Sequence, residues 1–514
     1  MENYIKEERG GVRIQSPVCD RQSALELSSD FSLPDYQPEI KRLLRVQATP
    51  LPPERYIGAG NADFTGTICY TVLYAGNDGE LYSTKETGEY HFSIPVEMTS
   101  DFEWNEGITC DCELTPEHTV GRVIAPRKFS VKCRLRSRVR MWGTRFLEET
   151  VSGAEKSAIQ RLCGHCDSAE ILVGTGEPLS LADEILCDAK AGDLRVISAQ
   201  GQVFVGETVA GSGIVCCRGE VSLKLLVQTE GNKSVPQTMW RRIPFVQDVP
   251  TDGAAVNCDS CATGICSDIQ VTVEENRILC EVSVCLQTQA QHNRHVSFTR
   301  DIYSTESDCE TKYSTVSVAR AIKCISGNVS VNATKSLEDA GIRSGLNIVD
   351  IYAIPSTPSA EQEGGKYILS GHCRCQVILT DGEEYSAQEF EIPYRYECDG
   401  GEIPVKDWRV SAEAISCRAR ADAERIGVDV ELAVVLATRG ESEIRMLREA
   451  HFGEALSRHG SVYTVCYPAS NDTLWSVAKR YHRSIDSVSS INGLSDAPRA
   501  DSIESLAGVK YLLV

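Results

Sequence analysis

Apolar and polar side chains alternate along most of this chain, as they do in β-strands that bury one face. The clearest run begins at Lys128 and places apolar side chains at every second position: Phe129, Val131, Cys133 and Leu135. Similar runs begin at Arg277 and Arg425. We therefore predict a mainly-β protein.

Three landmarks of this strand pattern recur at a nearly constant spacing. A glycine followed by an apolar run occurs at Gly66, Gly219 and Gly371, which are 153 and 152 residues apart. An Ile-Pro pair ends a strand at Pro95, Pro244 and Pro393, each 149 residues apart. The basic residues that open the long strands are 149 and 148 residues apart. A glycine-containing turn between the first two landmarks predicts a β-hairpin in each copy.

We expect three β-sandwich-like repeat domains, followed by a small domain of another kind. The expected bounds are 1–152 for the N-terminal segment and first repeat, 183–305 for the second repeat, 324–450 for the third and 462–514 for the last domain. Two segments, 155–178 and 306–323, are expected to connect the repeats. A period near 150 residues is far longer than that of solenoid repeats, so the repeats are expected to be separate beads.

The C-terminal tail has a different pattern. A short strand at 463–466 leads into a turn, and Asp472 or Thr473 is placed to cap a helix with apolar residues at helical spacing. Ser484 is placed to cap a second helix, and Gly493 fits the position after its end. Residues 509–514 predict a closing strand. The tail is therefore expected to form a βααβ domain of about 50 residues.

This tail resembles a LysM domain. The resemblance lies in Thr464-Val465, in the run from Asp472 to Ala478, in Tyr481 and in the run from Ile491 to Leu494. LysM domains usually bind N-acetylglucosamine polymers, such as peptidoglycan or chitin, in a groove between two loops. Carried over to this chain, the groove residues are Asn471, Asp472, Thr473, Leu474, Ile491, Asn492, Gly493 and Leu494. The first loop departs from the family pattern, because it is two residues longer and lacks the usual glycine.

The order of several β-rich repeats before one LysM domain resembles the SipL-like spore-coat morphogenetic proteins of endospore-forming clostridia. Their upstream region carries the SPOCS domain, which the repeat strands, the Ile-Pro pairs and the entry segment 33–44 resemble. The resemblance implies a non-enzymatic scaffold, made in the mother cell, that gathers at the forespore surface and spore coat. It also implies that the LysM domain docks to the coat-basement ATPase, a protein like stage IV sporulation protein A.

Two other functions are alternatives. The chain could be a peptidoglycan-binding protein whose LysM domain engages glycan directly. A cell-wall hydrolase with a LysM anchor would need a catalytic domain, and three β repeats leave little room for one.

Composition narrows the possible partners. Acidic residues outnumber basic ones by 73 to 52, which gives a net charge of −21, so phosphate backbones and anionic lipid repel the chain and nucleic-acid binding is not expected. The first 22 residues mix charges without an apolar core, and no run of 18 apolar residues predicts a transmembrane segment. We therefore expect a cytoplasmic protein in which most of the 22 cysteines are buried, reduced thiols.

The strand that begins at Lys128 has a cationic face. This face carries Lys132, Arg134, Arg136, Arg138 and Arg140, which we call the cationic stripe. The favoured interpretation is a solvated sheet face paired with acidic residues of neighbouring strands. The alternative is a docking stripe for an acidic partner or for the acidic surface of another repeat.

Two cysteine motifs could carry chemistry. Cys163-Gly-His-Cys166 matches a redox-active motif, but it lacks the strand-then-helix frame that such a motif needs. Cys258, Cys261 and Cys266 could supply three zinc ligands, with Cys163, Cys166, His292 or His295 completing a site. Zinc needs four converging donors, so a loop with free thiols is the favoured interpretation, and oxidative cross-linking is a further alternative. No metal, cofactor or catalytic residue is predicted.

Overall fold

The structure is a computed structural model of the 514-residue chain. It describes residues 4–5, 7–58, 60–97, 102–103, 107–155, 158–186, 194–229, 235–274, 277–456, 464–494, 506 and 509–514. Of the described residues, 77% lie in strands and 3% in helices. The fold is therefore mainly β, as the alternating pattern predicted.

Strands β2 to β8 form two sheets, which together are called unit 1. One sheet joins β2 (Glu8–Ser32), β8 (Lys128–Ser152) and β7 (Ile108–Ala125), with β8 in the middle. The other joins β3 (Ile40–Pro50), β4 (Glu54–Ile57) and β6 (Leu81–Pro95) to the central strand β5 (Asn61–Gly76). All these pairings are antiparallel. The apolar faces of the two sheets enclose a core that includes Phe64, Tyr70, Phe129 and Leu135.

Two further sets of strands follow the same pairing order. In unit 2, β16 (Arg277–Ser304) pairs with β10 (Ile159–Thr175), β11 (Leu179–Leu186) and β15 (Asp259–Glu274), and β13 (Ile214–Thr229) lies between β12 (Leu194–Ala210) and β14 (Gln237–Pro250). In unit 3, β23 (Arg425–Ala455) pairs with β17 (Ser307–Ser336) and β22 (Asp407–Ala421). Its other sheet joins β18 (Asn347–Pro355), β19 (Ser359–Glu363) and β21 (Tyr385–Asp399) to β20 (Lys366–Thr380). Outside these units, β1 (Tyr4–Ile5) pairs with β9 (Ala154–Glu155).

The repeated glycines lie where an aromatic ring covers the central strand of a unit. Each glycine pairs with an aromatic residue of the neighbouring strand: Gly66 with Tyr90, Gly219 with Phe245 and Gly371 with Tyr394. A Cβ atom on Gly371 would lie 2.5 Å from the hydroxyl oxygen of Tyr394, so a larger residue would displace the ring. The glycine therefore recurs because each unit packs an aromatic ring over the same strand position.

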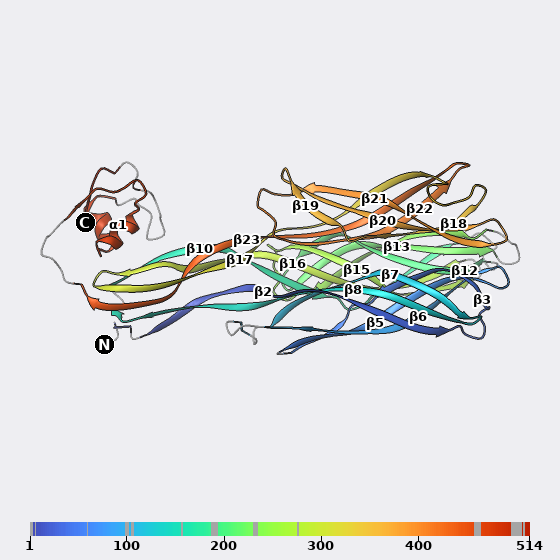
Figure 1. Ribbon diagram of the computed structural model, residues 1–514, viewed down its shortest axis with the longest axis horizontal. Coiled ribbons are helices and arrows are strands. Elements are labelled where there is room, and N and C mark those ends of the chain that lie inside the picture. The colour runs from blue at the N-terminus through green and yellow to red at the C-terminus, as the bar shows by residue number, and fades with distance from the viewer. Residues whose placement is uncertain are drawn as a thin grey trace.

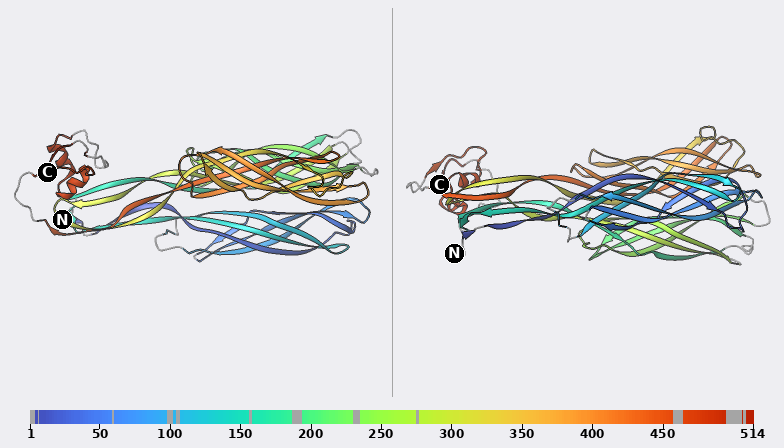
Figure 2. Two further views of the ribbon diagram at one scale, coloured as in Figure 1. Left: turned by 45° about the horizontal axis from the view of Figure 1, so that its top comes forward. Right: turned by 60° about the horizontal axis from the view of Figure 1, so that its bottom comes forward.

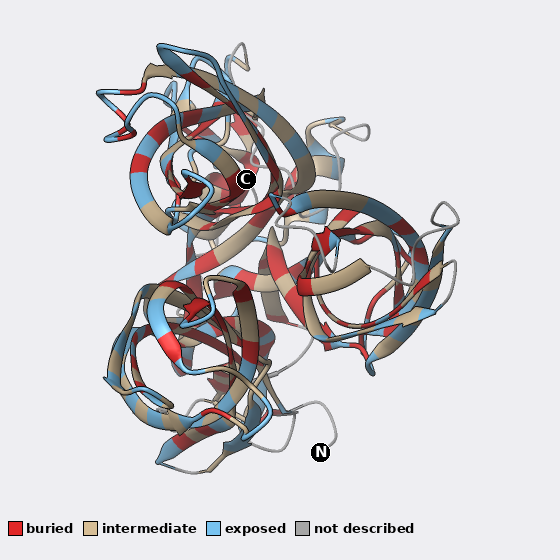
Figure 3. Cartoon of the chain, turned by 90° about the vertical axis from the view of Figure 1, so that its right-hand side faces the viewer, coloured by how far each residue is buried: buried red, intermediate tan, exposed pale blue. Residues whose placement is uncertain are grey.

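The three units lie side by side around a common axis (Figures 2 and 3). A β-bulge at the same place in each unit adds one residue to its sheet: Leu44, Ile197 and Val349. These residues and the residues beside them on the central strands, Leu73, Leu226 and Ile378, belong to one buried cluster. The expectation of separate beads was therefore wrong, because the units bury their outward faces against one another.

A stalk of long strands extends from one end of the three units (Figure 1). It consists of three antiparallel ribbons, β2–β8, β10–β16 and β17–β23. The ribbons pack on a core that includes Ile14, Leu147, Val296, Val318 and Met446. Parallel pairing of residues 449–451 with residues 150–152 joins β23 to β8.

The two segments expected to connect repeats are strands of the stalk instead. Residues 159–175 pair with β16, and residues 307–336 pair with β23. Gly164, within the first of these segments, lies in β10, and the ring of Phe298 lies 2.7 Å from its Cβ position. Glycine here marks a close approach of a side chain. The domain bounds drawn from the sequence stay predictions.

The C-terminal unit lies at the far end of the stalk (Figure 1). It consists of β24 (Val465–Cys466), α1 (Leu474–Arg480), α2 (Ile485–Ile491) and β25 (Leu512–Leu513), in the expected order of strand, two helices and strand. β24 and β25 pair antiparallel. Cys466, Leu474, Val477, Val488 and Leu512 are buried in its core.

Candidate functional site

The loop before α1 is fixed by hydrogen bonds of Asp472 and Thr473. Thr473 caps the helix, because its hydroxyl accepts a hydrogen bond from the backbone N–H of Ser476 at 3.1 Å. Asp472 accepts hydrogen bonds from the backbone N–H of Ala469 at 3.0 Å and from the Arg480 guanidinium at 2.6 Å. The Arg480 and Ala469 donors hold the pKa of Asp472 below its ordinary value. The Asp472 carboxylate therefore stabilises the conformation of this loop.

The loop after α2 is fastened to the last strand by Asn492. Its side-chain amide donates hydrogen bonds to the backbone carbonyls of Val488 at 2.8 Å and Leu513 at 2.7 Å. The same side chain accepts a hydrogen bond from the N–H of Leu513 at 2.7 Å. Gly493 follows with a φ of +66°, as expected for the residue after a helix C-cap. Asn492 therefore holds the loop against β25.

The eight residues predicted from the LysM resemblance have different environments. Asn471, Ile491 and Gly493 are exposed. Leu474 is buried in the core, and Leu494 packs against that core. Asp472, Thr473 and Asn492 hold the two loops in place, as described above. A sugar-binding groove made by these residues stays a prediction.

An exposed apolar surface lies on the β24–β25 pair. Val465 lies opposite Leu513, Tyr467 directly follows β24, and Tyr511 directly precedes β25. Val465 is 49% exposed, Tyr467 77% and Tyr511 58%. We call Val465, Tyr467 and Tyr511 the outward face of the C-terminal unit. Sequence reasoning assigned none of these residues to a site, although two tyrosines flanking short strands were a visible signal.

Another part of the C-terminal unit packs on the tip of the stalk. The Trp475 ring meets the ring of Tyr303 edge-on, with their centroids 4.9 Å apart. Asp301 accepts hydrogen bonds from Trp475 Nε1 at 2.8 Å and from Lys479 Nζ at 2.6 Å. Burial alone would raise the pKa of Asp301, but the hydrogen bonds from Lys479, Tyr313 and Trp475 hold it below its ordinary value. These contacts orient α1 on the stalk.

The cationic stripe is divided between the surface and the interior. Lys132 and Arg134 are exposed, Arg136 and Arg138 are partly buried, and Arg140 is 2% exposed. Arg138 pairs with Asp20 of β2 at 2.8 Å, so the predicted pairing with acidic residues of neighbouring strands is found. The predicted solvation is absent at Arg140, because Arg409 of unit 3 covers that end and shares Asp111 with it. Docking of an acidic partner at the exposed end stays a prediction.

The cysteine motifs do not form a chemical site among the described residues. Cys163 and Cys166 lie in one strand, three residues apart, so their side chains point to opposite faces of the sheet. The Cys258 sulfur lies 3.4 Å from His292 Nδ1. In the described part of the chain, however, no group of three or more His, Cys, Asp or Glu side chains is placed to hold a metal ion. Of the 21 described cysteines, 11 are buried and the others partly buried.

A buried ion cluster joins the three units. Asp350 of unit 3 accepts hydrogen bonds from Arg45 of unit 1 at 2.7 Å and from Lys224 of unit 2 at 2.9 Å. None of the three side chains is more than 6% exposed. Burial lowers the pKa of Lys224. Burial would raise the pKa of Asp350, but Lys224 and Arg45 hold it below its ordinary value. The only sequence signal for this cluster was a lysine inside the apolar run 223–227.

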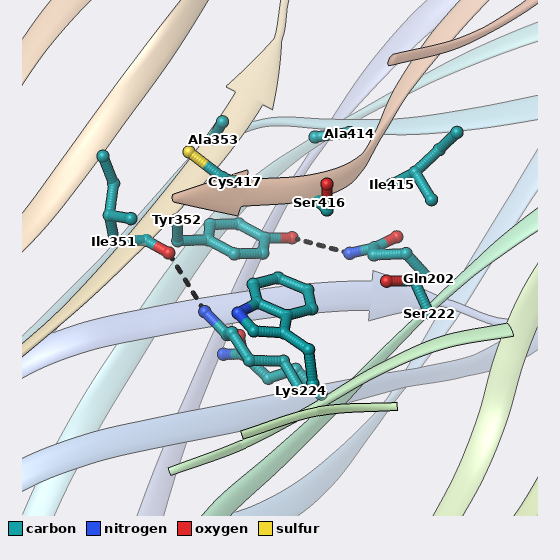
Figure 4. Close-up of a pocket in the computed structure, with 12 residues that line it drawn as sticks. Gln202, Ser222, Lys224, Ile351, Tyr352, Ala353, Ala414, Ile415, Ser416 and Cys417 are labelled. Atoms are coloured by element: carbon teal, nitrogen blue, oxygen red, sulfur yellow. Dashed lines mark hydrogen bonds between the residues drawn. The ribbon is translucent and has the colours of Figure 1, made fainter. Parts of the chain in front are cut away.

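A small pocket lies beside this cluster, between units 2 and 3 (Figure 4). Its volume is about 20 Å³, enough for a single water molecule. At its edge, Lys224 Nζ donates a hydrogen bond to the carbonyl of Ile351 at 3.0 Å. Gln202 Nε2 donates one to the Tyr352 hydroxyl at 3.3 Å. The pocket therefore belongs to the packing between units and is too small for an organic ligand.

Comparison with known proteins adds no relative to these observations. No family model, no curated protein and no solved structure matches the chain. Within the described ranges, no helix combines the length and the apolar character needed to cross a membrane.

Proposed function

We propose that this protein is a non-enzymatic scaffold of spore-envelope assembly, like the SipL-like coat morphogenetic proteins that its sequence resembles. In this proposal the three units are copies of one SPOCS-like domain, and the C-terminal unit is a LysM domain. The C-terminal unit docks the scaffold at the forespore surface, on the mother-cell side, by binding the coat-basement ATPase. The shared pairing order of the three units and the strand–helix–helix–strand order of the tail support this division.

The observation that carries the proposal is that the C-terminal unit packs on the stalk tip with one surface and exposes its outward face. Trp475 and Lys479 attach it to the stalk tip, while Tyr467 and Tyr511 on its outward face remain uncovered. The 15 residues of β17 from Ser307 to the bulge at Ile322 span roughly 50 Å at about 3.3 Å per residue. The stalk therefore holds the unit well away from the body of the molecule. Exposed tyrosines are characteristic of protein-binding surfaces, because they bury a large ring and keep a polar tip.

Peptidoglycan binding is the second candidate function. It is favoured by the exposure of Asn471, Ile491 and Gly493, which the LysM resemblance places in the sugar groove. The proposed protein-binding face and this groove use different side chains, so substitutions can separate the two functions.

The test uses the full-length chain and two double variants. Tyr467→Ala/Tyr511→Ala removes both rings of the outward face, and Asn471→Ala/Ile491→Ala removes the exposed groove side chains. Binding to the purified coat-basement ATPase is measured by interferometry, and binding to insoluble peptidoglycan by co-sedimentation. We expect the native chain to bind the ATPase and the tyrosine variant to bind at least about tenfold more weakly.

A matched control and two contrary outcomes complete the test. Tyr56→Ala removes a tyrosine of unit 1 that is 73% exposed, and it should bind the ATPase as the native chain does. If the native chain binds peptidoglycan but not the ATPase, and Asn471→Ala/Ile491→Ala loses the peptidoglycan binding, peptidoglycan binding is established as the function. Binding to neither would refute both functions.

A further inference from the structure

A large cavity lies between the three units. Its volume is about 670 Å³, within the range of small-molecule sites. Side chains from every unit line it, among them Leu114, Ile269, Tyr352 and Gln200. It reaches the surface beside Lys85 and Asp268, which are 48% and 50% exposed. This cavity is distinct from the C-terminal unit, so its role does not depend on which partner that unit binds.

Equivalent strand positions of the three units face this cavity with different residues. The strands β7, β15 and β22 each carry a bulge at the same register. The residue two positions before the bulge is Thr115 in unit 1, Ile265 in unit 2 and Glu413 in unit 3, and all three line the cavity. Because the fold accepts threonine and isoleucine here, the carboxylate of Glu413 is not required by the packing of the unit.

Glu413 has no partner among the described residues. It makes no hydrogen bond or ion pair there, and burial raises its pKa to about 7. Glu413 is partly buried, and a carboxylate that is partly removed from water without a partner either takes up a proton or attracts a cation. Its surroundings include Cys266 and Tyr352, which are neutral at pH 7 and supply no positive charge.

The cations that line the cavity are already paired. Their carboxylate partners lie within 3.5 Å: Lys85 with Asp268, Arg136 with Glu117, Arg138 with Asp20, and Arg409 with Asp111 and Glu113. Glu86 is a second lining carboxylate without a cation among the described residues, where its side chain accepts one hydrogen bond, from the Thr84 hydroxyl. The amide oxygen of Gln200 is buried, and no described residue donates a hydrogen bond to it. The unmet groups of the cavity are therefore acceptors and negative charges.

We propose that this cavity binds a small aliphatic amine, whose ammonium group pairs with Glu413. The ammonium supplies the hydrogen-bond donors and the positive charge that the lining lacks. The alkyl part contacts the apolar lining, which includes Ile265 and Leu114. A bare metal ion is a poorer match, because no group of three ligating side chains is found among the described residues.

The test is calorimetric titration of the full-length chain with butylamine, putrescine and spermidine at pH 8. We expect one binding site and at least about tenfold weaker binding to Glu413→Gln, because the variant has no charge to pair with the ammonium. Glu89→Gln, which neutralises an exposed carboxylate on β6, another strand that lines the cavity, should bind as the native chain does. Since Glu413 is near half-ionised at neutral pH, binding at pH 7 should release about half a proton per ligand in the native chain and none in Glu413→Gln.

Two results would overturn the proposal. One is the absence of binding by all three amines at concentrations on the order of 1 mM, which corresponds to about −4 kcal/mol. The other is equal affinity of the native chain and Glu413→Gln for spermidine. Circular dichroism of the variant ensures that a loss of binding does not reflect unfolding. Failure of this test leaves the partner of the C-terminal unit untouched, because that unit is tested by its own variants.

Discussion

Replacing Asp350 with alanine should strongly destabilise the packing of the three units. The substitution leaves Arg45 and Lys224 buried without their shared carboxylate, at sites no more than 6% exposed. Removing one partner of a buried ion pair costs about 3–5 kcal/mol, so we expect a loss of at least that size. Urea unfolding followed by tryptophan fluorescence measures it, because the Trp240 ring lies 5.7 Å from Lys224 Nζ and reports on this cluster.

The same variant should gain a characteristic pH dependence. Burial already lowers the pKa of Lys224, and removing Asp350 takes away the charge that opposes this shift. The unfolded chain then binds the lysine proton more tightly than the folded one, so stability should rise with pH and the variant should be less impaired at pH 9 than at pH 6. Asp183→Ala breaks an exposed ion pair with Arg241 and serves as the control, with a much smaller effect. A loss at Asp350 as small as that control would refute the role of the cluster.

Three further substitutions test other parts of the structure. Gly371→Ala should cost about 1–3 kcal/mol of unfolding free energy, because its Cβ meets the Tyr394 hydroxyl, and Tyr394→Leu in the same chain should recover part of the loss. Asp301→Asn should loosen α1 from the stalk and speed its hydrogen exchange at pH 7, whereas at a pH below the lowered pKa of Asp301, where the native carboxylate also loses its charge, the two proteins should converge. Glu413→Gln should be more stable than the native chain by up to about 3 kcal/mol at pH 8, and the difference should vanish near pH 4.5, as thermal unfolding will show.

The alternation of apolar and polar residues predicted the mainly-β class, and the recurrence of sequence landmarks located glycines at equivalent strand positions. Gly66, Gly219 and Gly371 were found from sequence alone because each faces an aromatic ring in an equivalent position. The packing of the units against one another was missed. Alternation reports that one face of a strand is apolar, but it does not reveal that a bulge turns Leu44, Ile197 or Val349 into a shared interior.

The candidate site was predicted in part for the same reason. Helix caps are local signals, so Thr473, Ser484 and Gly493 were placed correctly from a few neighbouring residues. The contact between Trp475 and Asp301 joins residues 174 positions apart, which no local pattern encodes. Glu413 was missed too, because its lack of a partner depends on the cavity formed by all three units.

Hydroxyl-radical footprinting of the full-length chain, alone and with the purified coat-basement ATPase, tests the proposed docking most directly. We predict that Tyr467 and Tyr511 lose reactivity in the complex, because they are 77% and 58% exposed in the free chain. Tyr56, which is 73% exposed on unit 1, should keep its reactivity. Unchanged reactivity of Tyr467 and Tyr511 at saturating ATPase, or protection by peptidoglycan fragments alone, would contradict the proposed docking.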